Sequence, residues 1–277
     1  MQEKNQQEKS TDPFKLSWDN KAKFYQEDLE QITFPSAVTL GNMLEISKAK
    51  NIVEMACATG LYSLYFLKTF NNAETFLSID FSDKMIELAN ETKSQTEGLC
   101  KTTKHEFIVG SAEDLSFIKE ESQDIYFSNL CVPLLLNPTK TLQEAKRILR
   151  KDGKIGITVP YLEKGSLIEL FVSTFKEFSK DPPPSISFFT RETLIKTFQE
   201  NGFEVVYCWE ESFRLPVFDE AGIDGMLAGE DQGPAFRKFD AETQKVIRAK
   251  ILEGFEKMRQ DLIAPYMKIL SIVAKKL

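Results

Sequence analysis

The chain has 277 residues, of which 42% are hydrophobic and 28% charged, and its formal net charge is −7. This balance is typical of a globular protein with a full core, and the acidic total argues against a nucleic-acid-binding surface, which is usually basic. The four cysteines form no CxxC pair and the chain has one histidine. We therefore expect reduced thiols and no metal site.

The first residues, "MQEKNQQEKSTDP", are polar and mixed in charge. They lack the apolar run of a signal peptide and the Arg-rich pattern of a transit peptide. No window in the chain has the roughly 18 apolar residues that a membrane span needs. We expect a disordered tail over residues 1–13 and a soluble, cytoplasmic protein.

Residues 14–50 place apolar side chains at helical spacing, and Pro35 should divide this segment into two helices. From residue 51 onward, strand patterns alternate with helical patterns. The expected strands are 51–56, 75–80, 105–110, 123–130 and 154–160. The helices between and after them are 61–70, 82–95 with Ser82 as its N-cap, 137–153 and 164–180. Such alternation predicts a parallel, doubly wound sheet.

After "DPPP" a further helix should begin at the N-cap Thr190 and stop at Gly202, followed by a sixth strand over 203–211. Residues 212–262 resemble two helices, and 268–277 alternate like a seventh strand. The expected fold is α/β: a doubly wound, mostly parallel, seven-stranded Rossmann-like sheet. Residues 14–277 should form one domain, with a helical lid over 14–50 and a helical cap over 212–262 before the last strand.

In such sheets ligands bind beyond the carboxyl ends of the strands. The first strand runs into "VEMACATG", whose small residues let backbone N–H groups approach an anionic ligand at a helix N-terminus. Alanine tolerates positive φ poorly, however, and two alanines stand where glycine is usual. Asp80 ends the second strand 20 residues after Gly60 (80 − 60), the usual offset of a ribose-binding carboxylate. This pattern suits a cofactor that contains adenosine.

At this point the chain resembles a known family, the class I S-adenosylmethionine-dependent methyltransferases, and within it the small-molecule type that includes quinone-biosynthesis enzymes. The resemblance extends over roughly residues 14–277. Besides the first loop, it is carried by "IDFSDKMIELA", "GSAEDLSF", "EAKRILRKDGKIGITVP" and "FTRETLIKTFQENGFEVV", in that order. It implies S-adenosyl-L-methionine as the cofactor.

The resemblance also implies a set of cofactor-binding residues. Glu54 would hold the methionine amino group, Asp80 the ribose hydroxyls, and Asn129 would lie near the methyl donor. The full set is Glu54, Ala56, Cys57, Ala58, Gly60, Asp80, Phe81, Met85, Ser111, Ala112, Glu113 and Asn129. Trp18 and Tyr25 share one helical face and would contact the cofactor from the lid. Ala58 and Ser111 depart from the family pattern, at positions where glycine and aspartate are usual.

Methyl transfer depends mainly on positioning the acceptor and excluding water, so the sequence identifies no definite catalytic residue. If the acceptor is a hydroxyl, a base is useful, and Tyr161 and Glu163 are the candidates. His105 is interpreted as a surface residue and Cys131 as a wall of the site. Aromatic and other apolar residues suggest an apolar acceptor pocket: Phe188, Phe189, Phe213, Phe218, Met226 and Phe236.

The sequence therefore predicts methyl transfer from S-adenosylmethionine to a small molecule, at oxygen or carbon, by in-line displacement. Two alternatives remain open. Because Ala58 and Ser111 depart from the pattern, the chain is alternatively a methyltransferase fold that no longer catalyses and serves as a binding or assembly partner. A third reading is a protein-directed methyltransferase that docks its partner through the cap. No nucleic-acid partner is expected.

Overall fold

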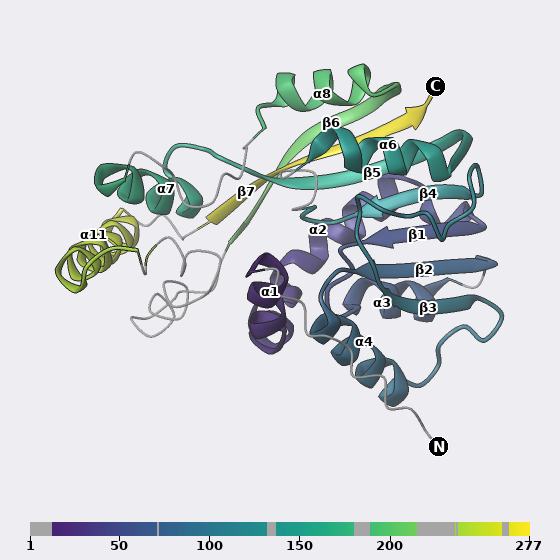
Figure 1. Ribbon diagram of the computed structural model, residues 1–277, viewed down its shortest axis with the longest axis horizontal. Helices are drawn as coiled ribbons and strands as arrows, with labels where there is room; N and C mark the ends of the chain where they lie inside the picture. Colours follow the sequence, from purple (N-terminus) through teal and green to yellow (C-terminus); the bar gives the residue numbers. More distant parts are fainter. Residues whose placement is uncertain are drawn as a thin grey trace.

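The computed structural model describes residues 13–70, 72–131, 137–179, 189–214, 236, 238–261 and 266–277. Its centre is a seven-stranded sheet with the strand order β3-β2-β1-β4-β5-β7-β6 (Figure 1). The strands are β1 (Asn51–Met55), β2 (Thr75–Asp80), β3 (Lys104–Val109), β4 (Gln123–Ser128), β5 (Leu149–Tyr161), β6 (Phe203–Arg214) and β7 (Tyr266–Lys276). The first five are parallel, and β7 runs antiparallel to both β5 and β6. The predicted α/β fold with a mostly parallel sheet is confirmed.

The helices pack on both faces of the sheet. They are α1 (Pro13–Phe24), α2 (Glu30–Met43), α3 (Leu61–Thr69), α4 (Asp83–Gln95), α6 (Pro138–Ile148), α7 (Leu167–Phe178), α8 (Arg191–Glu200) and α11 (Ala241–Gln260), with a short 3-10 turn at Ile46–Lys48. Buried side chains of α2 and α3 pack with Ile52 on one face, and those of α6 and α8 pack with Val53 on the other. Since successive side chains of a strand point to opposite faces, one strand supplies both cores.

The strand order reverses between β1 and β4, because β2 and β3 lie on one side of β1 and all later strands lie on the other. The carboxyl ends of β1 and β4 therefore open a crevice that no crossover covers. In doubly wound sheets this switch point is where ligands bind.

The break in the N-terminal helix differs from the prediction. Pro35 does not divide two helices: it lies inside α2. The interruption comes earlier, as a π-helical segment at Tyr25–Leu29 between α1 and α2. Proline has a φ that suits a helix and removes one backbone hydrogen bond without forcing an end, whereas a π-bulge changes the helical phase and often occurs at functional sites.

The end of α6 also differs, since the helix stops at Ile148 and Gly153 lies within β5. The last carbonyls of the helix, those of Arg147 and Ile148, accept hydrogen bonds from the backbone N–H groups of Glu121 and Ser122 at 3.0 and 2.9 Å. These partners lead the chain directly into the strand. The caps Ser82 and Thr190 and the left-handed Gly202 are found where the sequence predicted them.

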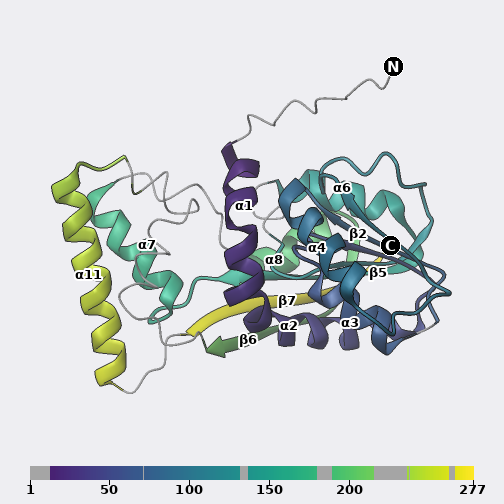
Figure 2. The same ribbon diagram turned by 90° about the horizontal axis from the view of Figure 1, so that it is seen from below.

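Helices α7 and α11 lie side by side at the far end of the long strands β5 and β7, away from the other helices (Figures 1 and 2). Phe171 and Phe175 of α7 pack with Ile247 and Ile251 of α11 in a separate apolar cluster. Gly254 permits the close approach, because a Cβ there would lie 2.4 Å from Leu170 Cδ1. The first helix expected in the 212–262 segment, and the tail over residues 1–12, fall outside the described residues.

Among the described helices, none combines the length and the apolar character needed to cross a bilayer.

Candidate functional site

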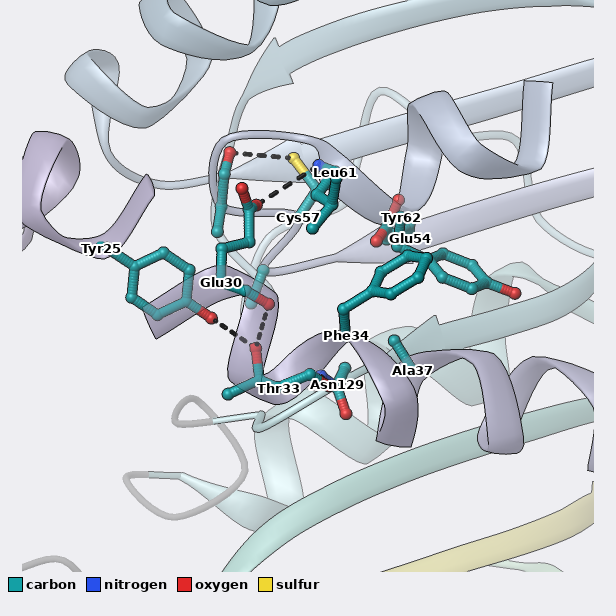
Figure 3. A pocket seen from close by; sticks show the side chains of 12 residues that line it. Tyr25, Glu30, Thr33, Phe34, Ala37, Glu54, Cys57, Leu61, Tyr62 and Asn129 are labelled. Carbon is teal, nitrogen blue, oxygen red and sulfur yellow. Dashed lines mark hydrogen bonds between the residues drawn. The ribbon is translucent and has the colours of Figure 1, made fainter. Parts of the chain in front are cut away.

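A pocket of about 320 Å³, part of it open to solvent, lies at the switch point between β1 and β4 (Figure 3). Helix α2 forms one wall, the loop after β1 forms another, and Asn129 comes from the end of β4. The lining residues are Tyr25, Glu30, Thr33, Phe34, Ala37, Glu54, Ala56, Cys57, Ala58, Leu61, Tyr62 and Asn129. Five of the predicted cofactor-binding residues therefore meet here: Glu54, Ala56, Cys57, Ala58 and Asn129.

The loop between β1 and α3 has an unusual backbone. Ala56, Ala58 and Gly60 all have positive φ, at 56°, 49° and 83°. These are the three positions at which the family pattern places glycine, so the alanines adopt a conformation that glycine takes freely, at a cost of roughly 1–2 kcal/mol each. At Gly60 side-chain space also matters, since a Cβ would lie 2.5 Å from Phe107 Cζ. The loop therefore has the left-handed backbone conformation typical of glycine at all three positions, although two of them are alanine.

The Asp80 side chain is hydrogen-bonded to the backbone of this loop. Its two carboxylate oxygens accept hydrogen bonds from the N–H groups of Ala58 and Ser82, each at 3.0 Å. The side chain is buried, and burial raises the pKa of Asp80 to about 6 despite these bonds. Asp80 thus fixes the loop, and its remaining lone pairs are suited to accepting hydrogen bonds from hydroxyl groups.

Glu54 lies at the base of the pocket, at 4% exposure. Ser63 of α3 donates to its Oε2 at 2.5 Å, and Ser78 of β2 lies at 3.5 Å from the same atom. Burial raises the pKa of Glu54 to about 8. A cationic group brought into the pocket would favour the ionised carboxylate.

Glu30 is a site residue that the sequence analysis missed. It begins α2 directly after the π-helical segment, and its side chain points toward the loop and the start of α3 (Figure 3). Thr59 Oγ1 donates to Glu30 Oε2 at 2.5 Å, and the N–H of Leu61 donates to Oε1 at 3.3 Å. Burial raises the pKa of this carboxyl as well. Only its place in the predicted lid hinted at a role.

Asn129 holds α2 against the end of β4. Its Oδ1 accepts from Ser36 at 3.0 Å and from Thr158 at 2.8 Å, while its Nδ2 donates to the carbonyl of Thr33 at 3.2 Å. Most of the bonding capacity of this amide is therefore used within the protein. Asn129 lines the pocket, and its contacts make α2 a fixed wall.

Helix α1 is docked on α4 next to the pocket. Asp19 Oδ1 accepts from Ser82 Oγ at 2.6 Å and from the N–H of Lys84 at 3.2 Å, and Lys15 pairs with Asp83. Trp18 and Tyr25 meet edge to face with their ring centroids 6.1 Å apart. The Trp18 Nε1 atom is buried and has no hydrogen-bond acceptor among the described residues.

The other predicted cofactor residues lie outside the pocket lining. Asp80, Met85 and Ala112 are buried at 5%, 1% and 2% exposure. Ser111 is exposed and forms a short bridge with Asp114. The remaining members of this group are Gly60, Phe81 and Glu113.

The two candidate bases also lie away from the pocket lining. Tyr161 ends β5, and its ring faces Lys268 Nζ, which is 5.8 Å from the ring centroid. The Glu163 carboxylate forms an ion pair with Lys268 and accepts from Tyr266 OH at 3.1 Å.

Several predicted neighbours of the acceptor have other roles. Phe189 is buried with the sheet core, and Phe236 packs on Phe175 with centroids 6.3 Å apart. Cys131 is fully buried in the same core as Phe189, so it is not a wall of the pocket. Phe188, Phe218 and Met226 fall outside the described residues.

His105 is not a surface residue, contrary to the interpretation of the sequence. It is partly buried, its Nε2 lies 3.0 Å from Ser78 Oγ, and burial lowers its pKa to about 3. Its ring packs against Phe107 within the sheet face instead of facing solvent. The described residues contain no group of three or more His, Cys, Asp or Glu side chains placed to hold a metal ion.

These residues fit S-adenosylmethionine. The cofactor has a sulfonium and an ammonium group, which match the acidic pocket, and ribose hydroxyls, which match the buried Asp80 carboxylate. The small residues at 56 and 58 leave the loop backbone accessible.

The family model described as "Methyltransferase domain" matches residues 53–157. Among curated proteins, the chain is 27% identical over 149 residues to an uncharacterised protein of Methanocaldococcus jannaschii, which covers 54% of this chain and 64% of that protein. It is 30% identical over 111 residues to malonyl-[acyl-carrier protein] O-methyltransferase 1 of Ilyobacter polytropus, covering 40% of this chain and 38% of that protein. In both cases the match spans less than two thirds of the relative's own length.

Among solved structures, a putative methyltransferase from Bacillus halodurans has a TM-score of 0.55 at 15% identity, with 86% of this chain and 98% of that chain covered. At 15% sequence identity, this similarity is evidence for a shared fold alone. That fold agrees with the sheet order and the switch-point pocket described above. The matched segment, residues 53–157, contains β1 through most of β5 and hence the loop, Asp80 and Asn129. Over the segment that forms this site, the chain is therefore similar to methyltransferase domains.

Proposed function

We propose that this protein transfers a methyl group from S-adenosylmethionine to a small-molecule acceptor, at oxygen or carbon. The observation that carries the proposal is the loop over residues 56–60, in which three alternate residues are left-handed between the carboxylates of Glu54 and Asp80. In a protein that binds no ligand here, nothing would offset the strain of two left-handed alanines in this loop.

Each residue has a binding or orienting role in this proposal. Glu54 receives the ammonium group, and Asp80 accepts hydrogen bonds from the ribose while it holds the Ala58 N–H. Asn129 orients α2, which closes one side of the pocket and excludes water. When bound, the cofactor would supply a methyl group activated by the sulfonium. The carbon–sulfur bond would break as the bond to the acceptor forms, which would leave a neutral thioether and release the acceptor's proton to solvent.

For the acceptor, we propose a small molecule with an apolar part, bound between the pocket and the α7–α11 unit, with residues 14–50 as the lid and 212–262 as the cap of one domain. Oxygen is supported as the acceptor atom by the O-methyltransferase relative. We assign no general base: Glu163 would first have to leave its ion pair with Lys268, and positioning alone supplies much of the rate of such reactions. A non-catalytic binding protein is not favoured.

The test is titration calorimetry of the full chain with S-adenosylmethionine and S-adenosylhomocysteine. We expect binding in the micromolar range, weakened at least tenfold (about 1.4 kcal/mol) in Asp80→Asn, which keeps the shape of the side chain but loses its charge. Asp261→Asn, at an exposed site after α11, is the matched control and should bind normally. No binding of either ligand at millimolar concentration would overturn the proposed function.

A further inference from the structure

The charged side chains that line the pocket are all acidic. Glu30 and Glu54 are among its twelve lining residues, Asp80 is attached to its loop through the Ala58 N–H, and none of the lining residues is Lys or Arg. The other titratable groups in the lining are Tyr25, Cys57 and Tyr62, and burial raises the pKa of each, so they are neutral and offset none of the carboxylate charge. Charges in buried sites are poorly screened by solvent and salt, so the net charge of a ligand strongly affects its affinity here.

Glu30 is the unexpected member of this set. Its carboxylate receives the Leu61 N–H at the first turn of α3, and the Thr59 hydroxyl just before it. In doubly wound folds the N-terminus of this helix is the place where an anionic ligand group binds. Here the Glu30 carboxylate occupies the place of that anionic ligand group. The helix N-terminus therefore binds a negative charge of the protein and is not available to an anionic part of the ligand.

Glu30 is also held in place. Asn129 bonds to Ser36 and to the carbonyl of Thr33 one turn further along α2. Leu40 of the same helix and Leu44, its C-cap residue, pack closely on Gly156 of β5, where a Cβ would lie 2.5 Å from Leu44 Cδ1. The carboxylate is thus a built-in part of the wall and does not swing away from the pocket at low cost.

We propose that Glu30 makes this pocket discriminate by charge, so that it holds the cationic methyl donor more tightly than the neutral thioether left after transfer. The inference rests on the proposed function and extends it. Near neutral pH, S-adenosylmethionine has a net charge of +1 from its sulfonium, ammonium and carboxylate groups, whereas S-adenosylhomocysteine has none. A third carboxylate in the wall favours the first and leaves the second nearly unaffected, which eases release of the by-product.

The experiment measures the affinities of both ligands by calorimetry for the wild type, Glu30→Gln and Glu27→Gln. The amide introduced by Glu30→Gln keeps one oxygen, which can accept from the Leu61 N–H, and its NH2 group can donate to the Thr59 hydroxyl oxygen in place of the bond that Thr59 donates in the wild type. Glu27 is an exposed acid of the same segment, with a side-chain exposure of 59% and a loose pair to Lys23 at 3.8 Å, so its substitution removes an equal charge away from the pocket. We expect Glu30→Gln to lower the affinity for S-adenosylmethionine at least tenfold and the affinity for S-adenosylhomocysteine less than threefold. Glu27→Gln should change neither affinity.

A change by the same factor for both ligands, or tighter binding of S-adenosylmethionine, would overturn the charge discrimination and leave the proposed function standing. Failure of both ligands to bind the wild type would overturn both. Glu30→Asp guards against a structural effect, because it keeps the charge and disturbs the packing. It should preserve the ratio of the two affinities, and loss of that ratio would contradict the inference.

Discussion

The Ala58 N–H donates to Asp80 Oδ2 at 3.0 Å, which ties the loop after β1 to the end of β2. This bond holds Ala58 in a left-handed conformation with φ of 49°. The alanine is therefore strained by the same contact that positions the proposed ribose carboxylate.

Replacing Ala58 by glycine should stabilise the protein. The substitution removes a cost of roughly 1–2 kcal/mol for left-handed alanine. The extra conformational freedom of glycine in the unfolded chain destabilises the folded state by about 0.4–1 kcal/mol. We expect a net gain of about 0.5–1 kcal/mol, seen as a rise of roughly 2 °C in Tm. The control is Ala249→Gly at an exposed position within α11, which should destabilise by about 1 kcal/mol. Equal losses in the two variants would show that Ala58 is not strained.

Stability without ligand should fall as the pH rises from about 5 to about 8. Glu54 has a pKa near 8 in the folded protein, above the ordinary value of 4.5, so the folded state binds the proton more tightly than the unfolded chain. Its contribution is complete below pH 4.5 and is lost as the pH passes through 8, with a slope of up to about 1.4 kcal/mol per pH unit for one proton. The acids Glu30 and Asp80 face it and act in the same direction.

The measurement for this prediction is Tm against pH. Glu54→Gln should flatten the profile and raise Tm at the alkaline end, because the neutral amide has no charge to bury. Glu97→Gln, on the exposed surface, should leave the slope unchanged. A profile for Glu54→Gln as steep as that of the wild type would contradict the assignment.

Asp19→Asn should loosen α1 from α4. The Asp19 carboxylate accepts two hydrogen bonds at the N-terminus of α4, where negative charge is favoured by roughly 0.3–1 kcal/mol. We expect faster amide exchange over Pro13–Phe24, with β1 and β4 unaffected, measured by hydrogen–deuterium exchange. Lys23→Gln, with a side-chain exposure of 77% on the same helix, is the control. Unchanged exchange in Asp19→Asn would mean that other contacts hold α1.

Trp18→Phe tests whether the buried indole N–H serves a ligand. The Trp18 Nε1 atom has no hydrogen-bond acceptor among the described residues. We expect affinity for S-adenosylmethionine to fall about 3–10-fold, as for one lost hydrogen bond of about 0.5–1.5 kcal/mol, while Tm changes little. The chain offers a matched control in its other tryptophan, since Trp209 Nε1 donates to Glu211 at 2.6 Å far along β6. Trp209→Phe should lower Tm and leave the affinity intact; the opposite pattern would contradict this role.

The local elements could be predicted because they depend on neighbouring residues. Alternation and caps gave the strands, the N-caps Ser82 and Thr190 and the stop at Gly202, and the glycine-like loop with Asp80 20 residues beyond it indicated the site. The end of α6 was predicted wrongly because its last carbonyls are satisfied by Glu121 and Ser122, from a distant part of the chain.

The sequence by itself determined the doubly wound sheet and predicted which residues lie around its switch point, because periodicity and loop composition act over a few residues. Tertiary structure decided which side chains complete the pocket. Glu30 is 29 residues from Thr59 in the chain and meets it only because a π-helical segment turns α2 over the loop and Asn129 fixes it there. Long-range contacts of this kind leave no periodic signal in the sequence, since each partner alone is an ordinary polar residue on an ordinary element.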